Sequence, residues 1–222
     1  LITAYTANTA GTITGLGNEA VTISDAITVA QANTIDAFTT GFITATILNT
    51  AIADLDNLTG TGNNYTITIT DETVTAASLN FLNSKTTTPL TVNSSTITGS
   101  ASDLITAYTS NTAGTIRGLG NEAVTLTDTS INASALITLD AFTTGLINAS
   151  SITTLTGSAT DQATVRGSSG ITGLPASIAS GSFTQIGSDI DGEASGDSSG
   201  SSVSLSSDGS VIAIGAWEND GN

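Results

Sequence analysis

The chain has no cysteine, no histidine and no methionine among its 222 residues, and only 4% of it is aromatic. Without thiol and imidazole groups, disulfides, zinc and haem sites and a Ser-His-Asp triad are excluded. Charged residues make up 10% of the chain, against about 25% in an ordinary soluble domain. The length allows one large domain or two small ones with a real core.

Positive charge is also scarce. Lys85, Arg117 and Arg166 are the three basic residues, against 19 acidic ones, and the formal net charge is −16. A negative field of this size repels nucleic acid and anionic membranes, so neither is an expected partner. No run of about 18 apolar residues and no signal or transit peptide is recognisable, so we expect no membrane insertion. The lack of cysteine favours an exported protein.

The most informative feature that is present is a duplication. Residues 1–26 (LITAYTANTAGTITGLGNEAVTISDA) return at 104–129 as LITAYTSNTAGTIRGLGNEAVTLTDT. A second pair, IDAFTTG at 35–41 and LDAFTTG at 139–145, keeps nearly the same offset. Such similarity across about a hundred residues predicts a duplicated structural unit.

The duplication also predicts how the array is divided. The first copy covers 1–103 and the second covers 104–172. Leu1 aligns with Leu104, which follows the segment GSASD at 99–103. The first copy therefore lacks its own start, and we expect the array to be truncated at both ends.

A shorter period of about 25 residues lies inside the long repeat. It is visible in the segments 42–64, 65–89, 90–114 and 146–170. Each opens with alternating β-branched or apolar residues, which predicts a short strand. The alternating pairs are Ile67 and Ile69, Val124 and Leu126, and Ile147 and Ile152.

A short helix is predicted after each strand. Ser100 with Asp103, and Ser158 with Asp161, have the spacing of a capping box in which Asp replaces the usual Glu. Apolar residues three or four apart follow, as expected for a helix of about two turns with one buried face. They are Leu104, Ala107 and Tyr108, and in other periods Leu79 and Leu82, and Leu136, Leu139 and Phe142.

We call one such stretch of strand plus helix a coil. Because a single coil cannot bury its apolar face, the sequence predicts a repeat solenoid over residues 1–172, in which the coils stack. Stacked Thr and Asn residues, with Thr alone supplying about a fifth of the chain, are expected to form ladders between coils. The alternative is a pure β-solenoid without helices.

The composition changes towards the C-terminus. Residues 173–182 are expected to be a linker or cap, and residues 183–222 a partial all-β segment rich in Ser and Gly. Val203 and Leu205 alternate with Ser before an Asp208–Gly209 turn signal, and a further apolar run follows it. This pattern predicts a β-hairpin.

Two resemblances to known families follow from these segments. The tract GSDIDGEASGDSSGSSVSLSSDGSVIAIGAWENDGN at 187–222 resembles one blade of the integrin-α-type FG-GAP β-propeller family of bacterial surface proteins. GSSVSLSSDGSVIAIGA stands where that family has its FG and GAP strands. The sequence departs from the family in that Trp217 replaces the proline of GAP and the calcium loop DxDxDG is not intact.

The array that precedes it, through LDAFTTGLINASSITTLTGSATD and TITGLGNEAVTISD, resembles the repeat tracts of very large secreted or cell-surface proteins of marine cyanobacteria. This second resemblance covers about residues 1–175. It implies an extracellular structural or adhesive role, and therefore an extracellular or cell-surface location.

One candidate metal site is visible. Asp189, Asp191, Glu193 and Asp197 lie close together in a glycine-containing segment rich in oxygen ligands, which suits a hard cation such as calcium. The alternative is a solvated acidic loop without a ligand. No other cofactor is expected.

The remaining motifs favour structural roles. GLGNEA, at 15–20 and 118–123, has the form of a dinucleotide fingerprint, but strands rather than a helix follow it, so we interpret it as a turn of the repeat. Asp54 with Asp56, and Asp71 with Glu72, are carboxylate pairs better explained by helix capping and surface charge than by glycoside hydrolysis.

Threonine-rich segments suggest one further function. A regular array of Thr methyl and hydroxyl groups can order water, which suggests ice binding, although the same residues also favour strands. The residues concerned are Thr66, Thr68 and Thr70, and Thr153, Thr154 and Thr156.

We therefore expect a non-enzymatic structural segment of a large extracellular protein that acts as a spacer, surface-layer or filament element. Unpaired strand edges on its end coils predict self-association end to end or with neighbouring copies. The alternative is a binding or adhesion module for calcium, a cell-surface glycan or ice. An enzyme is not expected, because no base, nucleophile or metal constellation converges.

Overall fold

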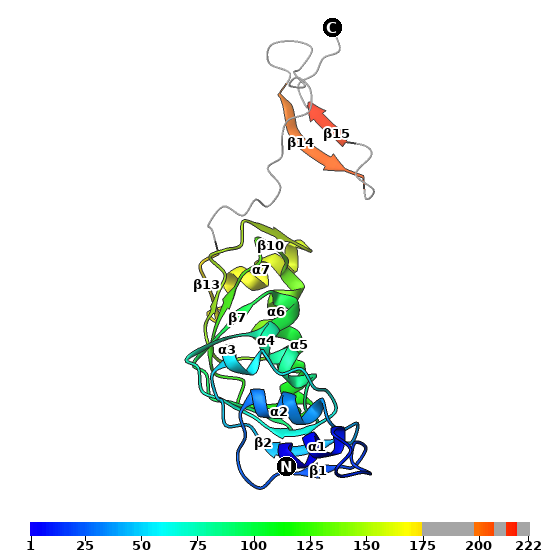
Figure 1. Ribbon diagram of the computed structural model, residues 1–222. Helices are drawn as coiled ribbons and strands as arrows, with labels where there is room; N and C mark the ends of the chain where they lie inside the picture. Colours follow the sequence, from blue (N-terminus) through cyan, green and yellow to red (C-terminus); the bar gives the residue numbers. More distant parts are fainter. Residues whose placement is uncertain (175–197, 207–211, 217–222) are drawn as a thin grey trace. The chain divides into compact units, whose positions relative to one another are not determined.

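The structure is a computed structural model that describes residues 1–174, 198–206 and 212–216. The chain divides into two compact units, Leu1–Ser180 and Gly181–Asn222 (Figure 1).

Short helices and strands alternate through the first unit. The helices are Ile2–Thr9 (α1), Val29–Asp36 (α2), Ile52–Leu55 (α3), Ala76–Asn83 (α4), Ala101–Thr112 (α5), Ala133–Asp140 (α6) and Ala159–Gly167 (α7). The strands are Val21–Thr22 (β1), Ile43–Thr46 (β2), Asn64–Thr66 (β3), Thr68–Ile69 (β4), Thr73–Thr75 (β5), Leu90–Val92 (β6), Thr96–Gly99 (β7), Ile116–Arg117 (β8), Ala123–Leu126 (β9), Ser130–Asn132 (β10), Ile147–Asn148 (β11), Thr154–Thr156 (β12) and Ile171–Thr172 (β13). The helices rule out the alternative of strands alone.

All the strand pairs within residues 1–174 are parallel, and they join strands that lie about one period apart in the sequence. The largest sheet has the order β13-β11-β9-β7-β5. At its centre the buried residues Val74, Ile97, Val124, Ile147 and Ile171 lie opposite one another in turn, 23 to 27 residues apart. Smaller parallel sheets have the orders β1-β2-β3, β4-β6-β8 and β10-β12.

A helix lies between each pair of successive strands in the largest sheet, as a parallel crossover requires. Helix α4 contacts α5, α5 contacts α6, and α6 contacts α7, and Figure 1 shows α6 and then α7 beyond α4 and α5 in the first unit. The architecture is thus α/β, with short parallel strands and short helices alternating at the predicted period.

The predicted helix starts are confirmed, but with a different bonding pattern from a full capping box. The Ser100 and Ser158 hydroxyls accept the backbone N–H of Asp103 and Asp161, each at 3.1 Å. Each Asp carboxylate, however, accepts the serine hydroxyl rather than the N-cap backbone N–H. Asp is one carbon shorter than Glu, and among the described helices the complete box occurs only where the longer Gln31 faces Thr28.

One expected strand is shorter than predicted. Ile147 begins β11, but the strand ends at Asn148, whose side-chain oxygen accepts the Ser150 backbone N–H at 3.1 Å. This local hydrogen bond turns the chain, so Ile152 is buried outside any strand.

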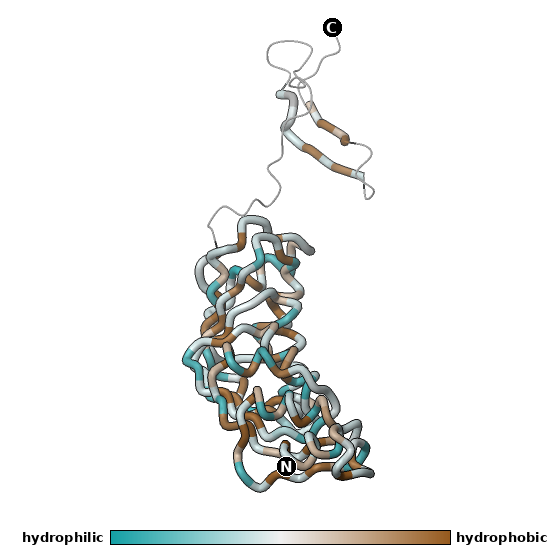
Figure 2. The backbone as a smooth tube through the Cα atoms, in the orientation of Figure 1, coloured by the Kyte–Doolittle hydropathy of each residue, from teal (hydrophilic) through white to brown (hydrophobic). Residues whose placement is uncertain are grey.

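A single hydrophobic cluster runs through the first unit, from Tyr5 to Ile171. The predicted helix residues Leu79, Leu82, Leu104 and Leu136 are fully buried in it. Figure 2 shows apolar residues recurring along the whole of this unit rather than in one long run. Each coil therefore contributes a few side chains to a shared core.

The sequence duplication is also a duplication of structure. Val21 pairs with Ile43 between β1 and β2, and their equivalents Val124 and Ile147 pair between β9 and β11. Helix α2 likewise corresponds to α6. The second copy thus provides an internal comparison for contacts made within residues 1–68 of the first.

In the second unit, strands Ser199–Leu205 (β14) and Ile212–Ala216 (β15) are antiparallel, with Val203 opposite Ile214. The predicted hairpin strands are therefore confirmed, while the Asp208–Gly209 turn lies outside the described residues.

Candidate functional site

The GLGNEA turns hold a feature that sequence patterns did not reveal. In the second copy, Glu122 accepts a hydrogen bond from the Tyr108 hydroxyl and from the backbone N–H groups of Gly120 and Asn121, at 2.8 and 3.0 Å. Glu122 is 4% exposed and Tyr108 1% exposed. This carboxylate is therefore buried and surrounded by donors.

The first copy repeats the arrangement. Glu19 accepts from the Tyr5 hydroxyl and from the Gly17 and Asn18 backbone N–H groups, the last two at 2.7 and 3.1 Å. The Tyr5 ring stacks on Phe38 with centroids 5.5 Å apart, as Tyr108 does on Phe142 at 5.8 Å. In both copies the motif is followed by a strand, β1 or β9, and not by the helix that a dinucleotide fingerprint requires.

The electrostatics of these pairs indicate a structural role. Hydrogen bonds from the Tyr5 hydroxyl and the Gly17 backbone lower the pKa of Glu19 to about 2. Burial, followed by the hydrogen bond to Glu122, raises the pKa of Tyr108 above its ordinary range. Burial and the hydrogen bond to Glu19 likewise raise the pKa of Tyr5. In the Tyr5–Glu19 pair a neutral phenol thus donates to an ionised carboxylate, and neither of these two groups is set to exchange protons near neutral pH.

Side chains from one coil cap helices of the coil before it. The Asp128 carboxylate accepts the Ala101 backbone N–H at the start of α5, and the Asp71 carboxylate accepts the Ile52 N–H at the start of α3, each at 2.7 Å. The Asn49 side-chain oxygen does the same for Val29 in α2 at 3.1 Å. Acceptors at these positions satisfy N–H groups that have no partner within the helix.

The four acidic residues considered as carboxylate pairs, Asp54 with Asp56 and Asp71 with Glu72, lie at helix starts or on the surface. Asp54 lies in the first turn of α3 and accepts from Asn49, and Asp56 accepts the Ser78 hydroxyl from a later coil. Asp71 is a helix cap and Glu72 is exposed. The capping and surface roles expected for these residues agree with the structure.

Threonine hydroxyls bond coil to coil, mostly to backbone carbonyls. After three of the helices, a buried Thr donates to a carbonyl of the preceding coil and accepts the N–H two residues further on. These residues are Thr39, donating to Glu19; Thr86, donating to Tyr65; and Thr143, donating to Glu122. Ladders between side chains also occur, as between Thr70 and Thr50 at 3.0 Å.

The threonines considered for ice binding that lie in strands are divided among three sheets. Thr66 lies in the β1-β2-β3 sheet, Thr68 in β4-β6-β8, and Thr154 and Thr156 in β10-β12. Thr153 donates to the Thr129 carbonyl at 3.0 Å. A longer row of polar residues that are not part of the core lies in the largest sheet. Its members, paired in register from strand to strand, are Thr75, Thr98, Thr125, Asn148 and Thr172.

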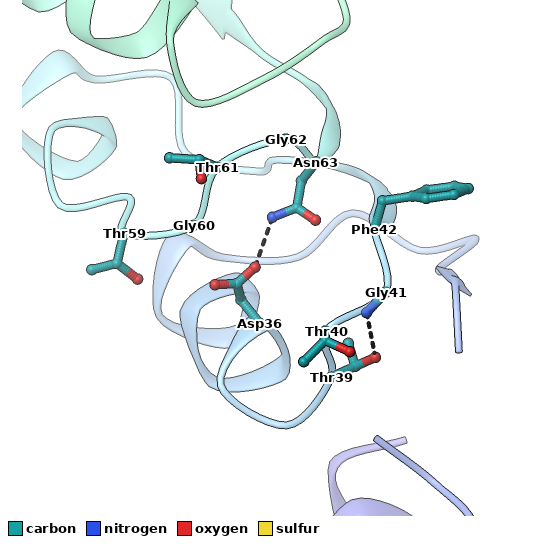
Figure 3. A pocket seen from close by; sticks show the side chains of 10 residues that line it. All are labelled: Asp36, Thr39, Thr40, Gly41, Phe42, Thr59, Gly60, Thr61, Gly62 and Asn63. Carbon is teal, nitrogen blue, oxygen red and sulfur yellow. Dashed lines mark hydrogen bonds between the residues drawn. The ribbon is translucent and has the colours of Figure 1, made fainter. Parts of the chain in front are cut away.

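One polar pocket, of about 320 Å³, lies beside the glycine-rich segment that follows α3 (Figure 3). Residues 36, 39–42 and 59–63 line it. Asn63 bonds at both ends of its amide, donating to Asp36 and accepting the Ile43 N–H, each at 2.7 Å. The Phe42 ring points away from this pair in Figure 3. The Asn63 amide and the Thr39 hydroxyl are therefore both engaged in hydrogen bonds within the protein.

The predicted metal ligands Asp189, Asp191, Glu193 and Asp197 lie outside the described residues. Within the described ranges, no three acidic, histidine or cysteine side chains are grouped so as to hold a metal ion. The described part of the chain also has no helix of the length and apolarity needed to cross a membrane. Comparison with protein-family models, with curated proteins and with solved structures found no match to this chain.

Proposed function

We propose that residues 1–172 form a solenoid that serves as a non-catalytic spacer within a large extracellular protein. The observation that carries the proposal is the five-stranded parallel sheet from β5 to β13. In it each coil pairs with the next, and the paired residues are an almost constant number of residues apart in the sequence. An array of this kind lengthens by adding coils, because each coil contacts only its neighbours.

The contacts between coils support a rigid element. Threonine hydroxyls bond to carbonyls of the neighbouring coil, and Asn49, Asp71 and Asp128 cap helices across the coil boundary. Because hydrogen bonds are directional, these polar contacts orient each coil relative to its neighbour, in addition to the burial provided by the continuous apolar core. Their partners lie within the protein, which fits a spacer better than a binding surface.

The composition supports the extracellular setting. The chain has no cysteine to oxidise, and only 10% of its residues are charged. The calcium alternative depends on Asp189, Asp191, Glu193 and Asp197, which lie outside the described residues, and stays a prediction.

The test is to lengthen the array. Extra copies of residues 1–103 are inserted after Asp103 in the full chain, a junction that reproduces the natural sequence because Leu1 and Leu104 begin the same segment. One copy contains four helices and therefore four coils. At roughly 4.8 Å per coil, each copy lengthens the particle by about 19 Å.

Electron microscopy of chains with one, two and four extra copies measures this increment. A separate globular domain of about 100 residues has a radius of gyration near 13 Å, and would add about 30 Å or more per copy. An increment of that size, or one that varies between copies, contradicts the proposal. A matched insertion carrying Leu79→Asp and Leu82→Asp, at two fully buried positions, is expected to break the linear relation.

A further inference from the structure

The polar pocket beside Asp36 lies where the two copies of the long repeat are built differently. Asp36 ends α2, and its equivalent Asp140 ends α6. In the second copy the next coil packs its backbone against this corner, where the Gly170 carbonyl accepts the Ile147 N–H at 2.8 Å. The Ser168 hydroxyl donates to Asp140, also at 2.8 Å. The end of α6 is thus in direct contact with the coil that follows.

In the first copy a side chain replaces that backbone contact. By strand register, Gly62 is the equivalent of Gly170. The Ile43 N–H, however, bonds to the Asn63 side-chain oxygen at 2.7 Å. The Asn63 amide nitrogen donates to Asp36, also at 2.7 Å, and Figure 3 shows these two side chains pointing toward each other. The second copy forms its equivalent strands without this arrangement, so the stacking of coils does not require it.

The segment 60–62 lines the pocket and carries unpaired backbone N–H groups. Gly62 has a φ of +75°, a conformation that favours glycine. A Cβ on Gly60 would lie 2.6 Å from Asp36 Oδ1, so glycine lets the backbone approach this carboxylate. Among the described residues, none accepts a hydrogen bond from the N–H groups of residues 60–62. These donors are therefore available to a ligand.

Side chains add further polar groups. Asp36 is half-buried, and its Oδ2 atom has no hydrogen-bond partner in the described structure, because only Oδ1 accepts from Asn63. Thr59 and Thr61 are exposed, and within the described ranges their hydroxyls make no hydrogen bond. The Thr40 hydroxyl donates to a backbone carbonyl at 3.3 Å, which leaves its oxygen free to accept. The pocket thus combines a carboxylate acceptor with hydroxyl and amide donors.

These groups select a neutral ligand that both donates and accepts hydrogen bonds. A hard cation such as calcium takes about six to eight oxygen ligands, and Asp36 is the one carboxylate among the residues that line the pocket. An anion is repelled by Asp36 and by the formal net charge of −16. An apolar ligand would leave the polar lining without partners, since Phe42 is the one large apolar residue of the lining.

We propose that this pocket binds a neutral saccharide. Hydroxyl groups of the sugar donate to Asp36 Oδ2 and accept from the N–H groups of residues 60–62 and the Thr61 hydroxyl. Phe42 is 54% exposed, with its ring turned away from Asp36 (Figure 3), so it contacts sugar rings that extend out of the pocket. The volume of about 320 Å³ is at the lower end for small-ligand sites, which suits a short saccharide. This binding function goes beyond the spacer role and does not depend on it.

The test is an NMR titration of the full chain with neutral tetrasaccharides: cellotetraose, maltotetraose, mannotetraose and N-acetylchitotetraose. At least one of them is expected to bind with a dissociation constant of about a millimolar or tighter. Tetragalacturonate, which carries carboxylates, is expected to bind about tenfold more weakly or less. No binding of any neutral tetrasaccharide at about 10 mM, or a preference for tetragalacturonate, would overturn the proposal.

Matched variants in the two copies locate the site. Asp36→Asn keeps an oxygen for the Asn63 amide and replaces Oδ2 with an NH₂ group, so it is expected to weaken binding about tenfold or more. Asp140→Asn makes the same change in the second copy and is expected to alter binding less than about twofold. Thr61→Ala, at an exposed position, is expected to weaken binding about threefold. Unchanged binding in Asp36→Asn and Thr61→Ala, or equal losses in the two Asp variants, would place the sugar elsewhere and refute the site.

The exposed ring has a matched control as well. Leu146 is the equivalent of Phe42 and is 56% exposed. Phe42→Ala is expected to weaken binding of the tetrasaccharide about fivefold and that of the corresponding monosaccharide less than about twofold. Leu146→Ala is expected to change neither. Equal effects of the two substitutions would contradict the contact assigned to Phe42.

Discussion

The three tyrosines of the chain allow a matched test of how buried polar groups stabilise this protein. Tyr108→Phe removes the hydroxyl that donates to Glu122 and keeps the ring that stacks on Phe142. Glu122 is then a buried carboxylate with only the Gly120 and Asn121 backbone donors described above. A hydrogen bond to a charged group contributes about 1.5–3 kcal/mol, so we expect a loss of that size.

The expected change in melting temperature follows from the size of the unit. For a domain of 150–250 residues, 1 kcal/mol corresponds to roughly 2–4 °C, so Tyr108→Phe should lower the melting temperature by about 3–12 °C. Thermal unfolding of the full chain, followed by far-ultraviolet circular dichroism, measures this shift.

Tyr65→Phe is the control, because it makes the same chemical change at an equally buried ring. The Tyr65 side chain is completely buried, and its hydroxyl has no hydrogen-bond partner in the described structure. An unsatisfied buried hydroxyl is costly, so its removal should stabilise the protein by about 1 kcal/mol. Equal destabilisation by the two substitutions, or no effect of Tyr108→Phe, would refute the assignment of stability to the Tyr108–Glu122 contact.

Two further predictions concern the same turns. Because the pKa of Glu19 falls from an ordinary 4.5 to about 2 in the folded chain, its ionised form stabilises the protein above pH 4.5, and this contribution is lost as the pH falls towards 2. The melting-temperature difference between the natural chain and Glu19→Gln should therefore shrink across that window, and a constant difference would contradict it. Gly145→Ala should destabilise by about 2 kcal/mol or more, because a Cβ there would lie 2.0 Å from the Glu122 carbonyl oxygen. Gly167→Ala, at a helix position where no atom beyond its own helix and chain neighbours lies within 4 Å of the added carbon, should be neutral or slightly stabilising. Denaturant titration of the two glycine variants measures the difference.

Local patterns were sufficient to predict several of the helices and strands. The alternation of Val124 and Leu126 predicted a strand, and the spacing of Ser100 and Asp103 predicted a helix start, because both signals depend on residues within one element. The buried faces of α4 and α6 followed from apolar residues three apart in the same way. These predictions needed only the geometry of a single helix or strand.

Contacts between coils could not be predicted in this way. GLGNEA was interpreted as a plain turn, because the partner of Glu122 lies 14 residues earlier on a helix. The one available signal was the identical spacing of Tyr and Glu in the two copies, at Tyr5 and Glu19 and again at Tyr108 and Glu122. Asp71 and Asp128 likewise cap helices 19 and 27 residues away, beyond the range of any capping motif.

These caps have a consequence for how the chain folds during its synthesis. The acceptor that completes the start of α3 is Asp71, and the acceptor for α5 is Asp128, so both lie later in the chain than the helix they cap. A chain that leaves the ribosome from its N-terminus therefore presents each of these helices before its cap exists. Each such coil reaches its full stability only once the next coil has emerged from the ribosome. During synthesis, the last coil to emerge therefore still lacks its cap.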